Sequence, residues 1–581
     1  MKTCLLGFLL LSVLSAQSTL AGQAALLAPN SPTIFFTDLT SGPNSGGENI
    51  GGTAGAYVTI YGNNFGATQG NSTVTLNSAN CGRVVTWGAT WNWYQKIVYQ
   101  LGPTCTSGQF VVTVAGQASI CENNEDGANC GFTVRSGNIR CVSIAGNDGN
   151  PGTFAGGCWA TMKKSIATVA AGDITYVENG VSITNDDGSG NRSVLGIGTI
   201  GGASGTASMP IALVAYPGAT VTIGNLSGSP AGEIAVRAYN SYYVIAGMRM
   251  MYDQGIYTGG SGQRIIANDI SCWNPSGVQG GCYQASLTNS LFVYGNYIHD
   301  TLHNNSKQGH ALYLSTDANH DWVAWNKLYN NTTCYSIQVH SSPLVAGTGN
   351  NQYDIHIHDN QINGDTCNGI NLATVDPSKG AVEVYNNMIQ NTGLQGSGIY
   401  PDLASYQNGC IYAAGILNNG AAGSGTVQIY NNTLYNCGSS SVTYPTKAAF
   451  ILLAGSEPNV KYQLTNNVTK QTSSATTYVG GDNSQYLCSP GTNDWFGSGG
   501  VPGLCAGDLN LDPLFNNALT GDLGLQATSP LIGIGSTTRM STHDVNGLRR
   551  PVPPSIGAYE LTASTSPAGP NPPTNLVIIV N

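Results

Sequence analysis

Charged side chains are scarce in this sequence. Only 20 of its 581 residues are Lys or Arg and 30 are Asp or Glu, or 9% in total, against about a quarter in an average soluble domain. Coiled coils and helical bundles need many charged residues, and intrinsically disordered chains combine high net charge with few Val, Ile and Tyr. The composition therefore excludes these classes.

No cluster of basic residues occurs, and the net charge is −10. Because an acidic surface repels phosphate groups, we expect no binding to nucleic acid or to anionic membranes. One long apolar run, from Leu5 to Leu14, is too short to span a membrane. A lysine precedes it and small residues follow it, which predicts a signal peptide over residues 1–21. We expect a secreted, extracellular protein, or one held in the periplasm or at the cell surface, with no membrane insertion.

No two cysteines have the CxxC spacing of zinc and thiol redox sites. Loss of the signal peptide removes Cys4 and leaves 14 cysteines, an even number that is typical of disulfides in an exported protein. Their order favours pairing of neighbours along the chain. Six pairs are predicted on this basis: Cys81–Cys105, Cys121–Cys130, Cys141–Cys158, Cys272–Cys282, Cys410–Cys437 and Cys488–Cys505.

Glycine is abundant, with 77 residues that have no three-residue period, which excludes collagen. Together with frequent Val, Ile, Tyr and Asn, it indicates an all-β protein with many tight turns. Alternating runs such as residues 57–61 and 110–114 predict a β-sandwich over residues 30–136. The segment 58–66, an apolar strand followed by Gly, two residues, Phe and Gly, resembles the IPT/TIG immunoglobulin-like family. Domains of this family act as spacers or binding accessories in secreted proteins.

Three tryptophans lie within seven residues of this first domain. Aromatic faces stack on sugar rings, so Trp91 and Trp93 are candidates for substrate binding, with packing in the core as the alternative.

A second unit follows over residues 138–560. It begins with a strand at 139–143, the loop GNDGNPGT at 146–153, an amphipathic helix at 161–171 and a strand at 172–177. This order resembles the N-terminal cap of secreted right-handed parallel β-helix proteins of the pectate-lyase-like class. We therefore expect an all-β chain, an immunoglobulin-like sandwich followed by a right-handed parallel β-helix.

An internal repeat supports this fold. An apolar strand ends in Asn, any residue, then Ile or Leu, with spacings of 28, 30, 34, 27 and 45 residues. The repeated asparagines are Asn268, Asn296, Asn326, Asn360, Asn387 and Asn432. Spacings of this size fit β-helix coils with variable loops, and stacked Asn side chains can hydrogen-bond along the column.

The repeat also predicts which residues are neighbours on successive coils, about 4.8 Å apart. It places His356 beside Glu383 and His358 beside Tyr385. It also puts Cys334 and Cys367 at one position of consecutive coils, which predicts a seventh disulfide.

Seven of the eight histidines lie between positions 299 and 358. Histidine titrates near neutral pH and serves as a general base, acid or metal ligand, although polar columns on a β-helix also tolerate it. The candidate catalytic residues are Lys307, His310, Tyr313, His340, His356, His358 and Glu383. The outward positions of the same coils supply candidate substrate contacts: Tyr294, Trp322, Gln338, Asn371, Tyr385 and Tyr412.

The β-helix resemblance implies a polysaccharide as the partner of a monomeric protein, and polysaccharide lyases and glycoside hydrolases as the activities. β-Elimination needs neutralisation of a uronate, a base and an acid, and Ca2+ often neutralises the uronate in this class. No compact Asp-rich ligand run occurs, so no metal ligand is assigned. We favour a lyase acting on a uronate-containing glycan. The alternatives are a non-catalytic surface, adhesion or carbohydrate-binding protein, and a glycoside hydrolase with paired carboxylates.

Near the C-terminus, the segments 512–515, 521–525, 529–531, 544–547 and 556–560 resemble the closing region of bacterial β-helix proteins of the choice-of-anchor type. We expect this region to cover the end of the stack, where an open sheet edge would invite aggregation. Residues 561–581 are rich in Pro, Ser and Thr and are expected to form a linker.

Overall fold

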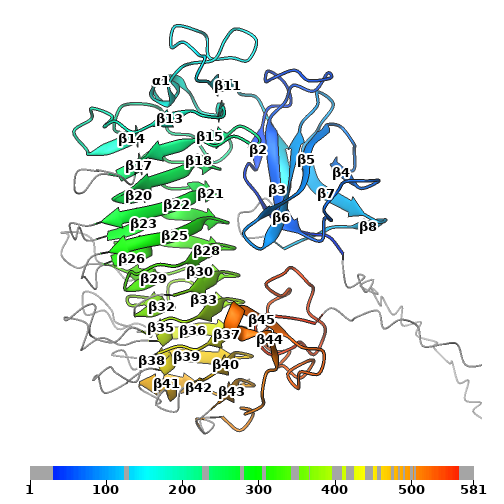
Figure 1. Cartoon of the computed structure of the whole chain (residues 1–581), viewed down its shortest axis with the longest axis vertical. Helices are drawn as coiled ribbons and strands as arrows, with labels where there is room; N and C mark the ends of the chain where they lie inside the picture. Colours follow the sequence, from blue (N-terminus) through cyan, green and yellow to red (C-terminus); the bar gives the residue numbers. More distant parts are fainter. Residues whose placement is uncertain are drawn as a thin grey trace, which may run out of the picture.

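The computed structural model describes residues 31–122, 130–225, 234–274, 280–303, 309–341, 352–364, 367–394, 409–413, 424–438, 449–453, 459–472, 477–481, 485–488, 491–497, 502 and 505–561. In this part of the chain β-strands dominate, and the predicted all-β fold is confirmed (Figure 1). No helix among these residues has the length and apolar character needed to cross a bilayer. The predicted signal peptide and residues 562–581 of the tail lie outside the described residues.

The N-terminal part is a sandwich of two sheets. One sheet has the order β5 (Arg83–Trp91), β6 (Tyr94–Gln100), β3 (Tyr57–Asn63), β1 (Thr33–Thr37) and β9 (Ile120–Cys121). The other has the order β2 (Ser41–Gly42), β10 (Gly131–Val134), β7 (Gly108–Val114) and β4 (Thr73–Leu76), with β8 (Gln117–Ala118) beside β7. Alternate residues of these strands, such as Val58 and Ile60, are fully buried, as the alternating pattern predicts.

The second part is a parallel β-helix with three sheets. Sheet 1 contains β11 (Ile139–Val142), β12 (Ile174–Val177), β15 (Ile211–Ala215), β18 (Tyr243–Ala246), β21 (Arg264–Ile266), β24 (Asn289–Tyr294), β27 (Asn319–Ala324), β30 (Ile355–His358), β33 (Val382–Tyr385), β36 (Gly425–Tyr430), β39 (Val460–Thr465) and β42 (Tyr486–Leu487). Sheet 2 contains β13 (Ser182–Ile183), β16 (Thr222–Gly224), β19 (Arg249–Tyr252), β22 (Asp269–Asn274), β25 (Tyr297–His303), β28 (Lys327–Tyr329), β31 (Gln361–Asn363), β34 (Met388–Gln390), β37 (Thr433–Tyr435), β40 (Val468–Lys470) and β43 (Asp494–Phe496). Sheet 3 contains β14 (Ser193–Ile197), β17 (Ile234–Ala238), β20 (Gln254–Thr258), β23 (Gly280–Ser286), β26 (Gly309–Ser315), β29 (Tyr335–His340), β32 (Asn368–Leu372), β35 (Gly409–Ala413), β38 (Ala449–Leu453) and β41 (Thr477–Gly481).

The asparagine column at the turn between sheets 1 and 2 is confirmed as a hydrogen-bonded ladder. The Nδ2 atom of Asn326 donates to Oδ1 of Asn360 at 3.0 Å, and Asn360 donates likewise to Asn387 at 3.0 Å. The ladder continues beyond the predicted members through Asn467 and Asn493. Because each amide also binds backbone groups, the ladder satisfies polar atoms that the turn buries.

One α-helix lies in the described part, α1 (Met162–Thr168), within the predicted span. The side chain of Thr161 caps it by accepting a hydrogen bond from the Lys164 amide. Met162 and Ile166 are buried in the core of the β-helix, so the helix closes the N-terminal end of the stack.

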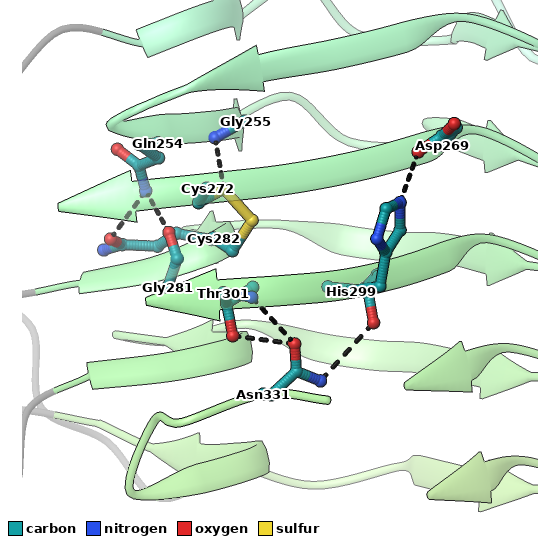
Figure 2. The surroundings of a disulfide bond; sticks show 11 residues. Gln254, Gly255, Asp269, Cys272, Gly281, Cys282, His299, Thr301 and Asn331 are labelled. Atoms are coloured by element: carbon teal, nitrogen blue, oxygen red, sulfur yellow. Dashed lines mark hydrogen bonds and ion pairs between the residues drawn. A yellow bond between two sulfur atoms is a disulfide. The ribbon is translucent and has the colours of Figure 1, made fainter. Parts of the chain in front are cut away.

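All seven predicted disulfides are confirmed. Figure 2 shows the bond that joins Cys272 of β22 to Cys282 of β23, two strands that belong to different sheets of the same coil. The Cys334–Cys367 bond instead joins consecutive coils, as the repeat predicts.

The N-terminal sandwich packs against sheet 1. The Phe35 ring stacks on Trp325 at a centroid distance of 5.9 Å, and Tyr294 packs against Phe36 at 5.7 Å. The Nε1 atom of Trp91 donates to the Gly295 carbonyl at 2.7 Å. These contacts fix the sandwich to the turn that precedes the asparagine ladder.

The C-terminal region contains β44 (Phe515–Asn517), the 3-10 helix η4 (Ala518–Thr520) and β45 (Asp522–Leu525). Just before it, Leu509 pairs with Asp494 of β43, the last strand of sheet 2, and exchanges backbone hydrogen bonds with Asn493 and Trp495. The C-terminal region lies along the flank of the β-helix, beside the sandwich (Figure 1). Asn386 donates to the His543 carbonyl at 2.7 Å and Asn466 to the Ser536 carbonyl at 2.9 Å, so turn asparagines on different coils hold it there.

Candidate functional site

The histidines that are clustered in the sequence separate onto the three sheets. His299 is on sheet 2, His310 and His340 are on sheet 3, and His320, His356 and His358 are on sheet 1. His303 ends β25, but its side chain is outside the described part, and Lys307 lies outside the described residues altogether. The predicted catalytic residues therefore form two groups on different faces.

Sheet 3 carries a row of polar and aromatic side chains on its outer face. The row runs in register from coil to coil through Arg237, Tyr257, Gln284, Tyr313, Gln338, Asn371 and Tyr412. Parallel strands place these positions about 4.8 Å apart. The members from Arg237 to Tyr313 are part-exposed, whereas Gln338, Asn371 and Tyr412 are at most 9% exposed. A ligand that lies along the row would therefore contact its N-terminal half.

Tyr313, in the middle of this row, contacts His340, which lies two residues after the row member Gln338 on β29. The Tyr313 hydroxyl lies 3.2 Å from Nδ1 of His340. Burial lowers the pKa of His340 and raises that of Tyr313. At neutral pH the pair therefore holds a neutral imidazole, which accepts a proton, beside a protonated phenol, which donates one.

Neighbouring groups hold this pair in place. The His310 ring packs against the Tyr313 ring at 4.5 Å and stacks on Tyr335 at 5.4 Å. One coil further, the Asn371 amide donates to Oε1 of Gln338 at 3.0 Å. The predicted residues His310, Gln338 and Asn371 thus surround the pair.

The sequence reasoning missed the N-terminal end of the row. The Arg237 guanidinium lies 5.3 Å from the Tyr257 ring centroid and donates to the Tyr239 hydroxyl at 2.7 Å. The repeat pattern could have identified these residues. Val236 and Ile256 continue the inward-facing column that contains Leu312, and Arg237 and Tyr257 each follow a member of that column.

No strand of sheet 3 contains Asp or Glu. Hydrolysis by the paired-carboxylate mechanism needs two such groups across the scissile bond, so the strands of this face do not supply it. Ca2+ takes 6–8 oxygen ligands, largely carboxylates. Among the described residues, no group of three or more His, Cys, Asp or Glu side chains could hold a metal ion.

On sheet 1, His356 lies between two carboxylates. Its Nδ1 atom is 3.2 Å from Oε2 of Glu383, and its Nε2 atom is 3.0 Å from Oδ1 of Asp354. Arg539 of the C-terminal region also binds Glu383, at 3.1 Å. Burial raises the pKa of Glu383, but His356 and Arg539 outweigh it and lower that pKa. The group is an ion-pair network that joins the β-helix to the C-terminal region.

Packing accounts for the aromatic candidates on sheet 1. Trp322 stacks between Phe292 at 5.1 Å and His356 at 5.2 Å. His358 is 1% exposed and stacks on Tyr385 at 4.6 Å. Contacts within the protein also account for the aromatic candidates at the sandwich, Tyr294, Trp91 and Trp93.

Tyr294 is fully buried beneath the N-terminal sandwich. Trp91 and Trp93 donate through their indole nitrogens to the carbonyls of Gly295 and Val545, respectively. These three aromatics therefore serve the junction between the parts of the chain, and the structure does not bring them to the row on sheet 3.

On sheet 2, His299 is also held between two carboxylates. Its Nε2 atom lies 2.7 Å from Asp269, the pair drawn in Figure 2, and its Nδ1 atom lies 2.8 Å from Asp300. Burial lowers the pKa of His299, but the two carboxylates outweigh it and raise that pKa. This arrangement stabilises the charged form of the imidazole.

The chain matches no family model and no curated protein. Its structure is similar to that of the pectate lyase Pel9A, with 15% sequence identity and a TM-score of 0.50 over 73% of this chain and 96% of that one. An alginate lyase from Paenibacillus sp. str. FPU-7 has 12% identity and a TM-score of 0.38, over 56% of this chain and 95% of that one. A rhamnogalacturonan lyase has 14% identity and a TM-score of 0.35, over 61% and 87%. At 15% identity, the similarity to the pectate lyase establishes one point, that the chain has the parallel β-helix fold.

Proposed function

We propose that this protein is a secreted polysaccharide lyase that cleaves a uronate-containing glycan by β-elimination on the outer face of sheet 3. The hydrogen bond between His340 and Tyr313, a member of the polar row on sheet 3, carries the proposal. The seven disulfides and the signal-peptide pattern support secretion, because disulfides persist in oxidising compartments. The proposal retains the IPT/TIG type for the sandwich and the choice-of-anchor type for the C-terminal region.

In the proposed reaction the neutral His340 imidazole takes the proton from C5 of the uronate. The C5–H electron pair forms the C4=C5 double bond as the C4–O4 bond breaks. Tyr313 donates its proton to the leaving O4, and the 3.2 Å hydrogen bond then lets His340 return a proton to Tyr313. From the sequence alone, since Lys307 lies outside the described residues, we keep Lys307 as the candidate that neutralises the uronate carboxylate, and no step uses a metal ion.

The test is incubation of the purified protein with polygalacturonate, alginate and other uronate polysaccharides, with the ultraviolet absorbance of the C4=C5 product as the readout. The proposal expects this absorbance to rise with at least one polymer. It expects Tyr313→Phe and His340→Ala to lower the rate by about 10²–10⁴-fold. His320→Gln is the matched control, since His320 lies on sheet 1 and binds Asp354 at 2.6 Å.

The other outcomes identify the alternatives. Glycan binding without product would favour a carbohydrate-binding or adhesion protein. New reducing ends without the absorbance would favour a glycoside hydrolase. Loss of activity in His356→Gln, with full activity in His340→Ala, would place the active site on sheet 1. Each result would overturn the lyase proposal as stated.

A further inference from the structure

A second column of polar side chains marks the turn that follows the strands of sheet 2. One residue per coil there has a left-handed backbone, with φ of 54° at Asn330, 86° at Gly364, 56° at Asn391 and 51° at Asn436. Asn tolerates this conformation because its short polar side chain bonds locally, and Gly tolerates it because it has no Cβ. These four positions are three asparagines and one glycine, and Asp300 (φ 49°) precedes them in the column, where it accepts a hydrogen bond from Asn330.

The glycine leaves a pocket in this column. No atom lies within 4 Å of the point where a Cβ on Gly364 would sit. A cavity of about 310 Å3 opens here, between Asn330 on one side and Asn391 on the other. Its size lies at the lower end of the ~300–1,000 Å3 range of small-molecule sites.

The lining combines amides with apolar surface. The Asn391 amide donates to Oδ1 of Asn363 at 3.0 Å, and Asn436 donates to Oδ1 of Asn391 at 2.7 Å. Within the described part of the chain, Nδ2 of Asn363 and Oδ1 of Asn330 make no hydrogen bond. A donor and an acceptor are therefore available to a ligand.

Tyr329 and Leu394, which is 37% exposed, supply the apolar wall of the pocket. Lys327 packs on the Tyr329 ring, with Nζ 4.5 Å from its centroid, and so fixes the ring. Among the described residues that line the pocket, none is Asp, Glu, Lys, Arg or His.

From this geometry we propose that the pocket at Gly364 binds a neutral sugar residue. A pyranose needs amide donors and acceptors for its hydroxyl groups and an aromatic or aliphatic wall for its C–H face, and this pocket has both. Because the described lining residues carry no charge, they favour a neutral sugar over a uronate. The pocket belongs to sheet 2, whereas the proposed active site lies on sheet 3, so this is a separate site and does not depend on the lyase proposal.

The test measures binding of galactose, glucose, xylose, rhamnose, arabinose and galacturonic acid to the full chain by calorimetric titration. The decisive variant is Gly364→Asn, which restores the side chain found at the neighbouring positions and fills the pocket without disturbing the left-handed turn. Gly218→Asn is the matched control, because Gly218 also has a left-handed backbone (φ 79°) and open space around it. The melting temperature of both variants checks the fold.

We expect at least one neutral sugar to bind, Gly364→Asn to weaken that binding at least ten-fold, and Gly218→Asn and Tyr313→Phe to leave it unchanged. Asn363→Ala should weaken the same sugar binding by removing the Nδ2 donor, whereas Gly364→Asn does so by filling the pocket. The proposal is overturned by any of three results. These are no binding of a neutral sugar, unchanged binding in Gly364→Asn, or a loss in Gly364→Asn that is confined to galacturonic acid.

Discussion

The Nε2 atom of His543 lies 3.2 Å from Oδ2 of Asp359, so a histidine of the C-terminal region binds a carboxylate of the β-helix. The Nδ1 atom of the same ring lies 2.8 Å from Oε2 of Glu122 in the N-terminal sandwich. Asp359 binds His358 as well, at 2.7 Å. All these side chains are buried, and they join three parts of the chain that are far apart in sequence.

Replacement of His543 by Ala is expected to destabilise the protein by about 3–5 kcal/mol, because the buried carboxylates of Glu122 and Asp359 each lose an ion-pair partner. The free energy of unfolding in urea measures the loss. His320→Gln is the control, since its ion pair with Asp354 is part-exposed and contributes about 0–1 kcal/mol. Equal losses in the two variants would show that the buried network adds no more to stability than the part-exposed ion pair does.

Stability is expected to fall on both sides of an intermediate pH. Burial lowers the pKa of His543, but Glu122 and Asp359 outweigh it and raise that pKa well above 6.5. Its contribution is therefore complete below pH 6.5 and is lost as the pH rises through the folded-state pKa.

The pKa of Asp359 moves the other way. Burial raises it, but His543 and His358 outweigh burial and lower it below 3.8. Its contribution is complete above pH 3.8 and is lost as the pH falls through the folded-state value. Melting temperatures across pH should show a plateau between these limits, and His543→Gln should remove the alkaline decline. An alkaline decline that persists in His543→Gln would assign it to other groups.

The pH profile of kcat/KM should reflect His340. Because burial lowers the pKa of this imidazole below 6.5, activity is expected to rise with pH to a midpoint below 6.5 and to change little just above it. The residual kcat/KM of His340→Ala should not show this rise with pH. A midpoint above 6.5, or one that is unchanged in His340→Ala, would contradict the role of His340 as the base.

Loss of one ladder amide should cost more than loss of a surface amide. Asn360 donates to the Val323 carbonyl and to Asn387, and its Oδ1 accepts from Asn326. Asn360→Ala leaves several buried groups unsatisfied, at about 1–3 kcal/mol each. Asn363→Ala, at the pocket on sheet 2, should cost under about 0.5 kcal/mol. Thermal unfolding of the two variants compares them, and similar melting temperatures would mean that the ladder contributes little.

The sequence predicts features that repeat with every coil. Val323 and Ile357 point inward because strand residues alternate, and Cys334 meets Cys367 because both occupy one position of adjacent coils. Both follow from the spacing of the ladder asparagines, so the fold, the register and the disulfides could be predicted.

The face that each histidine occupies was harder to predict. His340 and His356 are close in sequence, but the chain turns between them from sheet 3 to sheet 1. Only tertiary contacts decide which outer face is covered. The residue before a ladder asparagine was a usable signal for a covered face. Asp359 and Asn386 occupy this position, and both bind the C-terminal region.

The contact between Glu122 and the C-terminal region joins residues that are 420 apart in sequence, with nearly the whole β-helix between them. Repeat solenoids ordinarily fray from their ends, because each repeat contacts only its neighbours. Here the segments that flank the solenoid are fastened to each other and to its middle coils. The coils at either end therefore cannot unfold one at a time, starting from a free chain end. We expect the solenoid to unfold as one cooperative unit.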